Sequence, residues 1–233
     1  MKTNRKRIFQ DGRTYHITHR CHNRCFNLRF SLDRDNYLRR MWEAKCRYDV
    51  SVLDYIITSN HVHILISAVD GSQISRFMQY VSSLSARDYN RRKEKTGALW
   101  EGRYRSTLIQ DGTHLGRCLF YVDLNMVRAA GLEHPAKWKW SGHHELVGRR
   151  HRYRLLDREN LLKKLCCNSE DQFRKWYDVG IAEKLHQTEI QRMQRESFWS
   201  DSRVVGDYEF VLGQARRKDR KKIVEAGSGL CYL

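Results

Sequence analysis

Two histidines separated by a single residue stand in an apolar stretch, "SNHVHILI", at residues 59–66. The β-branched and apolar residue types predict a strand, and side chains two apart on a strand point to the same face. His61 and His63 should therefore project together, at a spacing that suits two ligands of one metal ion. A half-exposed strand whose polar face uses histidine twice has the same pattern, so other residues must decide between the two interpretations.

A second polar pair occurs in the helical segment "FYVDLN", where Tyr121 and Asn125 are four residues apart. Residues at this spacing are neighbours on one helix face. A tyrosine hydroxyl beside a metal-binding amide suits nucleophilic attack on a phosphodiester, with the amide oxygen completing the coordination. Two imidazoles and a carbonyl oxygen suit Mg²⁺ or Mn²⁺, and Mn²⁺ matches the two nitrogens better. A core tyrosine and a solvent-facing asparagine are the alternative, and Asp123 should point elsewhere on the helix.

The elements that must position these residues follow from hydrophobic periodicity. Strands are predicted over 13–21, 49–59, 61–68 and 103–110, and helices over 33–48, 72–92 and 111–131. This order predicts a ferredoxin-like α+β fold: a split βαββαβ antiparallel sheet with its helices mainly on one face, which leaves the other face free for a ligand. Further helical segments are expected over 157–167 and 171–196.

The chain divides, on this interpretation, into two parts. Residues 1–150 form the domain with the polar pairs, and residues 151–233 form an accessory helical and basic C-terminal extension, because the apolar content there is thin. The seven cysteines are scattered, and Cys21, His22 and Cys25 lack the second half of a zinc site. Reduced thiols are therefore expected.

Charge indicates the kind of partner. Lys and Arg total 44 against 27 Asp and Glu, a net charge of +17 over 233 residues, which implies a polyanion. No apolar run approaches the length of a membrane-spanning helix, and the basic N-terminus lacks the apolar stretch of a signal peptide. We therefore expect a soluble, cytoplasmic protein with no membrane partner.

Basic residues gather in two regions that could contact nucleic acid. One set is predicted to bind phosphates from the N-terminal segment, and a second set combines cations with aromatic rings that could stack on unpaired bases. A solvated basic face with core aromatics is the alternative. The predicted DNA-binding residues are Arg5, Lys6, Arg7, Arg13, Arg20, Arg24, Trp100, Arg103, Tyr104 and Arg105.

Four motifs in order, "NHVHIL", "LWEGRYRS", "FYVDLNMVRAAGL" and "WKWSGHHELVG", resemble those of the REP-associated tyrosine transposases. These belong to the HUH single-tyrosine nucleases, named for a His-hydrophobic-His pair. The resemblance covers about the first 150 residues, and the later "VVGDYEFV" is similar to a short C-terminal motif of the same family.

The resemblance implies a role for each matched residue. His61 and His63 would hold a divalent metal with Asn125 as third ligand, and Tyr121 would attack the scissile phosphate of single-stranded DNA. That step leaves a 5′-phosphotyrosine and a free 3′-hydroxyl. The implied substrates are palindromic repeat hairpins, and a monomer is expected. Relatives usually have proline after the helix asparagine; here Met126 stands there, so the helix should run more smoothly past Asn125.

Two other functions remain open. A catalytically inactive DNA hairpin-binding module of the same fold would keep the shape without the reaction, which the intact set of four residues argues against. An RNA-binding protein of the same α+β shape would need paired aromatics on neighbouring strands, and histidines occupy that place. The order of preference is nuclease and strand transferase, then binding module, then RNA-binding protein.

Overall fold

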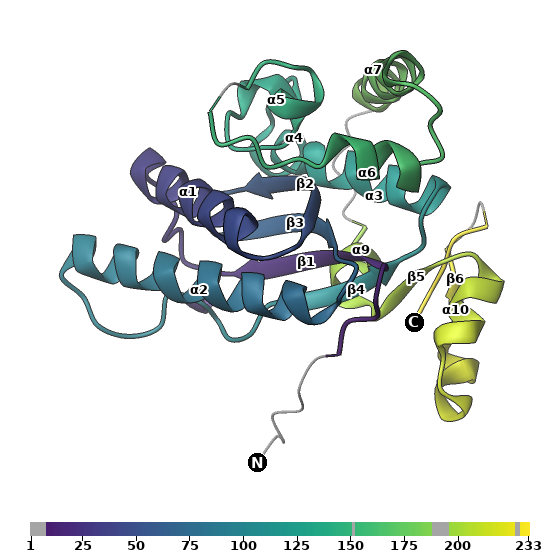
Figure 1. Cartoon of the computed structure of the whole chain (residues 1–233), viewed down its shortest axis with the longest axis horizontal. Coiled ribbons are helices and arrows are strands. Elements are labelled where there is room, and N and C mark those ends of the chain that lie inside the picture. The colour runs from purple at the N-terminus through teal and green to yellow at the C-terminus, as the bar shows by residue number, and fades with distance from the viewer. Residues whose placement is uncertain (1–7, 151, 188–195, 227–228) are drawn as a thin grey trace.

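Four strands alternate with two helices in the predicted order (Figure 1). The structure is a computed structural model that describes residues 8–150, 152–187, 196–226 and 229–233. Its first elements are β1 (Thr14–Arg20), α1 (Ser31–Arg47), β2 (Ser51–Ile57), β3 (His61–Ser67), α2 (Ser72–Lys93) and β4 (Arg105–Ile109).

These four strands form the central part of one sheet. The strand order is β2-β3-β1-β4-β5-β7-β6, and the pairs β2–β3, β3–β1 and β1–β4 are all antiparallel. The order β2-β3-β1-β4 is the one that a split βαββαβ unit produces when its two helices connect non-adjacent strands. The predicted α+β class and ferredoxin-like arrangement are confirmed.

The register between β1 and β3 decides which side chains share a face. Thr18 lies opposite His63, and Arg20 lies opposite His61. Residues directly opposite in an antiparallel pair point to the same side of the sheet. One face therefore carries His61, His63 and the even-numbered residues of β1, whereas the intervening apolar residues point to the other face.

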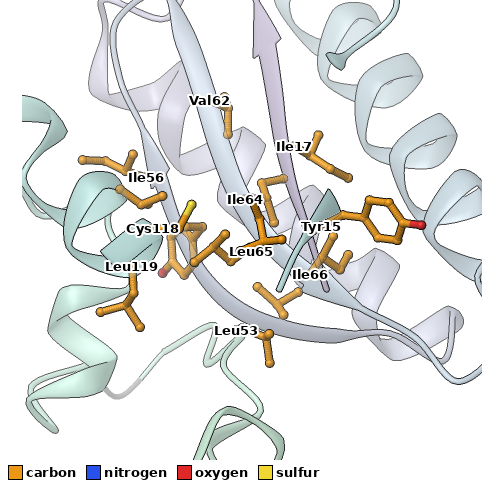
Figure 2. Packing of buried hydrophobic residues seen from close by; sticks show 14 of the residues in the cluster. Tyr15, Ile17, Leu53, Ile56, Val62, Ile64, Leu65, Ile66, Cys118 and Leu119 are labelled. Atoms are coloured by element: carbon orange, nitrogen blue, oxygen red, sulfur yellow. The ribbon is translucent and has the colours of Figure 1, made fainter. Parts of the chain in front are cut away.

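Helices α1 and α2 cover the apolar face. Trp100, from the loop before β4, packs there: its ring lies 5.7 Å from that of Tyr37 in α1, and its Nε1 donates to the Ser82 oxygen of α2 at 3.0 Å. The helix α3 (Thr113–Asp123) packs on the opposite face, where Figure 2 shows Cys118 beside Leu65 of β3. The predicted placement of helices on one face thus holds for α1 and α2, while α3 occupies part of the face that carries the histidines.

The remaining helices and strands complete the molecule. The strands among them lie after residue 150, in the segment that the sequence predicts as helical and basic. The sequence does not reveal them because each is too short to show the alternation of apolar and polar residues typical of a strand. In chain order they are α4 (Asn125–Ala130), α5 (His143–Leu146), α6 (Arg158–Lys164), α7 (Glu170–His186), α9 (Phe198–Asp201), β5 (Val204–Gly206), α10 (Tyr208–Gln214), β6 (Val224–Glu225) and β7 (Cys231–Tyr232), with short 3-10 turns at His22–Arg24, Pro135–Lys137 and Arg217–Lys222.

The segment after residue 150 is joined to the first 150 residues by both sheet pairing and core packing. Strand β5 runs parallel to β4, with Val204 opposite Leu108. Helix α7 packs on α3 so closely that a Cβ at Gly180 would lie 2.2 Å from the Phe120 ring. The division at residue 150 stays a prediction, but the two parts share one sheet. No helix in the described part of the chain is long and apolar enough to cross a membrane.

Replacing Phe173 tests this packing. Its ring is fully buried, 5.6 Å from that of Tyr177, so Phe173→Ala should lower the free energy of unfolding by about 3–5 kcal/mol through lost burial and the cavity left behind. Phe26 is 66% exposed, and Phe26→Ala should change it by less than about 0.5 kcal/mol. Urea unfolding of both variants is the measurement, and equal effects would contradict the packing of α7 on the core.

Candidate active site

His61 begins β3, and its orientation is fixed by the turn before it. Its Nδ1 lies 2.7 Å from Oδ1 of Asn60, and Nδ2 of Asn60 donates to the Arg24 oxygen at 3.2 Å. Because the amide donates through Nδ2, its oxygen faces the imidazole and accepts from Nδ1. The lone pair of His61 then lies on Nε2, which is the usual arrangement for a histidine that binds metal.

His63 is 3% exposed and lies between β1 and the end of α3. Its ring centroid is 4.9 Å from that of His61, with the planes at 89°. Its Nδ1 is 2.8 Å from Nε2 of His16, and its Nε2 is 3.2 Å from Nδ2 of Asn125. Burial lowers the pKa of His16 to about 4, partly offset by a hydrogen bond to the Trp199 carbonyl.

Asn125 brings an unpaired oxygen to this cluster. Its Oδ1 is buried and has no hydrogen-bond partner among the described residues. As placed, Nδ2 of Asn125 faces Nε2 of His63, and turning the amide over would bring the orphaned Oδ1 to the same side, where a cation would satisfy both Oδ1 and Nε2. No three His, Cys, Asp or Glu side chains within the described ranges converge on a metal-sized site, so a metal here would rest on two imidazoles and the amide. This donor set fits Mg²⁺ or Mn²⁺.

Tyr121 stands in the last turn of α3. Its ring is 5% exposed, with its centroid 5.8 Å from His63 and 6.0 Å from His16. Leu124, with φ −83° and ψ 5°, separates α3 from α4, so the helix is interrupted just before Asn125. The smoother course expected past Asn125 concerns α4, which continues without a break from Asn125 to Ala130. The Tyr121 carbonyl, at the end of α3, accepts from the Arg128 guanidinium.

Arg128 is a site residue that the sequence analysis did not single out. Its guanidinium lies over the Tyr121 ring, 4.4 Å from the centroid, a geometry typical of cation–π contacts. Burial lowers the pKa of Arg128, and the neighbouring Tyr121 partly restores it. The spacing in the sequence could have identified Arg128 as a neighbour of the site, because a residue three after Asn125 and seven after Tyr121 lies on the same helical face as both.

These side chains surround one pocket of about 220 Å³, to which α9 also contributes through Ser200. Its lining is Arg20, His61, His63, Tyr121, Asn125, Arg128, Ala129 and Ser200. A second pocket of about 260 Å³ shares Arg20 and Ser200 with the first and contains Thr18, His19, Glu101, Gly102, Arg103, Arg105 and Asp201. The four residues predicted to carry the chemistry are thus brought together, with three of the predicted DNA-binding arginines beside them.

The other predicted DNA-binding residues lie in different surroundings. Arg5, Lys6 and Arg7 fall outside the described residues. Arg13 precedes β1 and lies at the opposite end of that strand from Arg20. Arg24 supports Asn60 through its main-chain oxygen.

Of the two predicted base-stacking aromatics, Trp100 is a packing residue. It is 8% exposed, and its ring stacks on His19 with centroids 4.0 Å apart. Tyr104 is partly buried near Phe9, with ring centroids 6.4 Å apart. Arg105 forms a 2.5 Å ion pair with Asp201. Whether such a side chain is buried depends on packing partners that lie far away in the sequence, so the residues around it in the chain do not reveal it.

Asp123 points away from the pocket, as expected from its place on the helix. Its Oδ2 accepts from the Tyr177 hydroxyl at 2.5 Å. Burial raises the pKa of Asp123 to about 7, although the Tyr177 hydrogen bond opposes the shift. Burial, and then repulsion by Asp123, also raise the pKa of the fully buried Asp54 well above its ordinary value. The carboxyls therefore form a buried pair on the far side of α3.

A His-hydrophobic-His strand opposed by a tyrosine and an asparagine from a later helix is the arrangement expected of a single-tyrosine transposase. Residues 10–123 match the family model for IS200-like transposases. This part, just under half of the chain, is therefore similar to the IS200-like transposases, and the resemblance predicted from the sequence is confirmed. The matched range includes both histidines and Tyr121. A search of curated proteins found no significant match.

Two transposases are among the solved structures that match the chain. One is a REP-associated tyrosine transposase bound to a REP hairpin, with a TM-score of 0.53 and 15% identity, covering 63% of this chain and 86% of that one. The other is a putative transposase from Deinococcus radiodurans, with a TM-score of 0.35 and 16% identity, covering 53% of this chain and 96% of that one. The first shows that the two proteins share a fold.

The buried carboxyl pair predicts a pH dependence of stability. Unfolded carboxyls lose their protons near the ordinary pKa of 3.8, whereas the folded pair holds them to higher pH. The folded pair therefore binds more protons than the unfolded pair between about pH 4 and about pH 7, and its contribution to the free energy of unfolding falls as pH rises through this range. The buried His16 and His143, whose pKa values burial lowers, contribute in the opposite direction.

Asp54→Asn should flatten that fall and make the chain more stable than the wild type above about pH 7. Asp171→Asn, at an exposed position in α7, should leave the slope unchanged. Urea unfolding across the range measures both variants. An Asp54→Asn slope equal to that of the wild type would contradict the assignment, since the comparison cancels the contribution of the buried histidines.

Proposed function

We propose that the chain is a metal-dependent single-stranded DNA endonuclease and strand transferase that acts on palindromic repeat hairpins through a 5′-phosphotyrosine intermediate. The observation that carries the proposal is the convergence of Tyr121, His61, His63 and Asn125 on one pocket. The match of residues 10–123 to a family model for transposases supports it independently. The fold is shared with a transposase that binds a REP hairpin.

Tyr121 supplies the nucleophile. Its Oη would bond to the scissile phosphorus as the bond from phosphorus to the 3′-oxygen breaks. The phenol loses its proton, and the departing 3′-oxygen takes one, so a free 3′-hydroxyl remains. Attack by the 3′-hydroxyl of another strand reverses the step and transfers the DNA, because the phosphotyrosine bond conserves the energy of the phosphodiester.

Positive groups around Tyr121 favour this step. The Arg128 guanidinium lies over the phenol ring, where it would stabilise the phenolate. Arg20 lines both pockets and could contact the nonbridging phosphate oxygens. Stabilisation of charge on the phosphoryl oxygens is usually the largest contribution to catalysis of such reactions.

His61, His63 and Asn125 would hold the divalent metal. The two imidazoles would offer Nε2, and Asn125 would offer the buried Oδ1 that has no partner among the described residues. When bound, Mg²⁺ or Mn²⁺ would neutralise charge that develops on the phosphoryl oxygens. Nucleophilic attack and the binding of the phosphate would be carried out by protein side chains.

DNA would be held by the basic surface beside the pocket. Arg103 and Arg105 line the neighbouring pocket of about 260 Å³, and the net charge of +17 supports a polyanionic partner. A hairpin is the partner named for the structural relative. A monomeric state and a cytoplasmic location stay predictions.

Removing the phenol hydroxyl tests the nucleophile. Tyr121→Phe should abolish covalent attachment to DNA while hairpin affinity changes little, because only the hydroxyl is lost. The purified chain is incubated with labelled single-stranded DNA containing palindromic repeats from its own genome, with Mn²⁺ or Mg²⁺, and run on a denaturing gel. His63→Ala should also lose the adduct, and the wild type should lose it when the metal is chelated.

The same gel separates the alternatives. Tight hairpin binding by the wild type without an adduct under either metal would favour the inactive binding module. A stronger preference for RNA of the same sequence would favour the RNA-binding protein. An adduct that persists in Tyr121→Phe would contradict the role of this tyrosine.

Arg128→Ala should slow adduct formation by about 10²-fold to 10³-fold, the range typical of losing one preorganised group that stabilises charge. Hairpin affinity should change much less. Arg39→Ala is the matched control, since Arg39 is a partly exposed helical arginine on α1 that pairs with Glu43. The measurement is the single-turnover rate of adduct formation. Equal rates for Arg128→Ala and the wild type would contradict the proposed role of Arg128.

A further inference from the structure

His16 lies in the middle of β1, 1% exposed, directly behind His63. Its Nε2 is 2.8 Å from Nδ1 of His63, and its Nδ1 is 2.7 Å from the main-chain oxygen of Trp199 in α9. The two imidazole planes differ by only 16°. A continuous line of hydrogen bonds thus runs from the C-terminal segment through His16 to the proposed metal ligand.

The direction of these hydrogen bonds follows from their chemistry. The Trp199 oxygen can only accept, so Nδ1 of His16 carries the proton. The described residues place no carboxylate within hydrogen-bond distance of the His16 ring, and a fully buried imidazole in such surroundings is neutral. Nε2 of His16 is therefore an acceptor, and the proton between the rings belongs to Nδ1 of His63. The lone pair of His63 lies on Nε2, which faces Asn125.

The Trp199 oxygen is available because α9 ends at Asp201. In a longer helix the amide of Arg203 would donate to this oxygen. Here that amide donates to the Leu233 oxygen, where Arg203 directly precedes β5 and Leu233 directly follows β7. The carbonyl left over at the helix end needs a donor, and His16 supplies it.

We propose that His16 is a positioning residue for the metal site: together with the Trp199 carbonyl, it holds His63 in the tautomer whose Nε2 binds the metal. The other tautomer would carry a proton on Nε2 and could not coordinate. Helix α9 thereby contributes, through the Trp199 carbonyl, to a site whose ligands all lie before residue 126. The metal in this inference rests on the proposed function, but the tautomer is a property of the metal-free chain.

The tautomer can be observed directly. Long-range ¹H–¹⁵N correlation spectra of the full-length, metal-free chain identify the protonated nitrogen of each histidine, with His63→Gln used to assign its signals. We expect His63 to carry its proton on Nδ1 and His16 likewise. A proton on Nε2 of His63 would overturn the proposal, and this measurement needs no variant of His16 to fold.

Metal affinity tests the consequence. His16→Phe keeps a planar ring but removes the acceptor at 2.8 Å and leaves Nδ1 of His63 the more distant Thr18 hydroxyl at 3.3 Å. The Kd for Mn²⁺ without DNA should therefore rise about 10-fold to 100-fold, as for other lost partners of metal ligands. His16→Gln offers an amide oxygen to His63 and an amide donor to the carbonyl, so it should retain most of the affinity. His114→Phe removes another buried imidazole, at the start of α3, and should leave the Kd unchanged.

Electron paramagnetic resonance of free Mn²⁺ measures all three variants, with thermal unfolding as a check on folding. Wild-type affinity in a folded His16→Phe variant would overturn the proposal, as would equal losses in His16→Phe and His16→Gln. The outcome is distinguishable from failure of the proposed function. Mn²⁺ binding with the expected tautomer but no DNA adduct would contradict the nuclease and leave the role of His16 intact.

Discussion

The antiparallel pairing of β1 with β3 is the constraint on which the site depends. It places Thr18 opposite His63 and Arg20 opposite His61, and so decides what stands behind and beside the proposed ligands. A slip of one residue would carry the β1 side chains to the opposite face of the sheet. The apolar residues that alternate with these prevent such a slip, since Ile17 of β1 is paired with Ile64 of β3 and both are buried on the face covered by α1 and α2.

The second half of the site depends on how α3 meets the sheet. This helix is buried along nearly its whole length, because β2 and β3 lie on one side and α7 lies on the other. Its last turn therefore brings Tyr121 to the edge of the pocket, and the interruption at Leu124 is followed at once by Asn125. Rigid elements on both sides hold the nucleophile and the proposed ligands, which suits a reaction that relies on positioning.

The sequence predicts those parts of the fold and the site that depend on local spacing. Alternation identified the face shared by His61 and His63, and a spacing of four residues joined Tyr121 to Asn125. The contact between His16 and His63 could not be predicted, because it depends on pairing between strands 47 residues apart. Strand β5 has three residues and no detectable period. Trp100 illustrates the same limit for burial, since an aromatic ring among arginines can stack on DNA or pack on a helix.

The most direct test of the account is to locate the DNA on the protein after reaction. The wild-type chain is incubated with repeat-hairpin DNA and Mn²⁺, digested with nuclease and protease, and mapped by mass spectrometry. The account predicts one modified peptide, carrying a nucleotide 5′-phosphate on Tyr121. Attachment at another tyrosine, such as the buried Tyr177, or DNA cut without any protein-linked nucleotide, would contradict it.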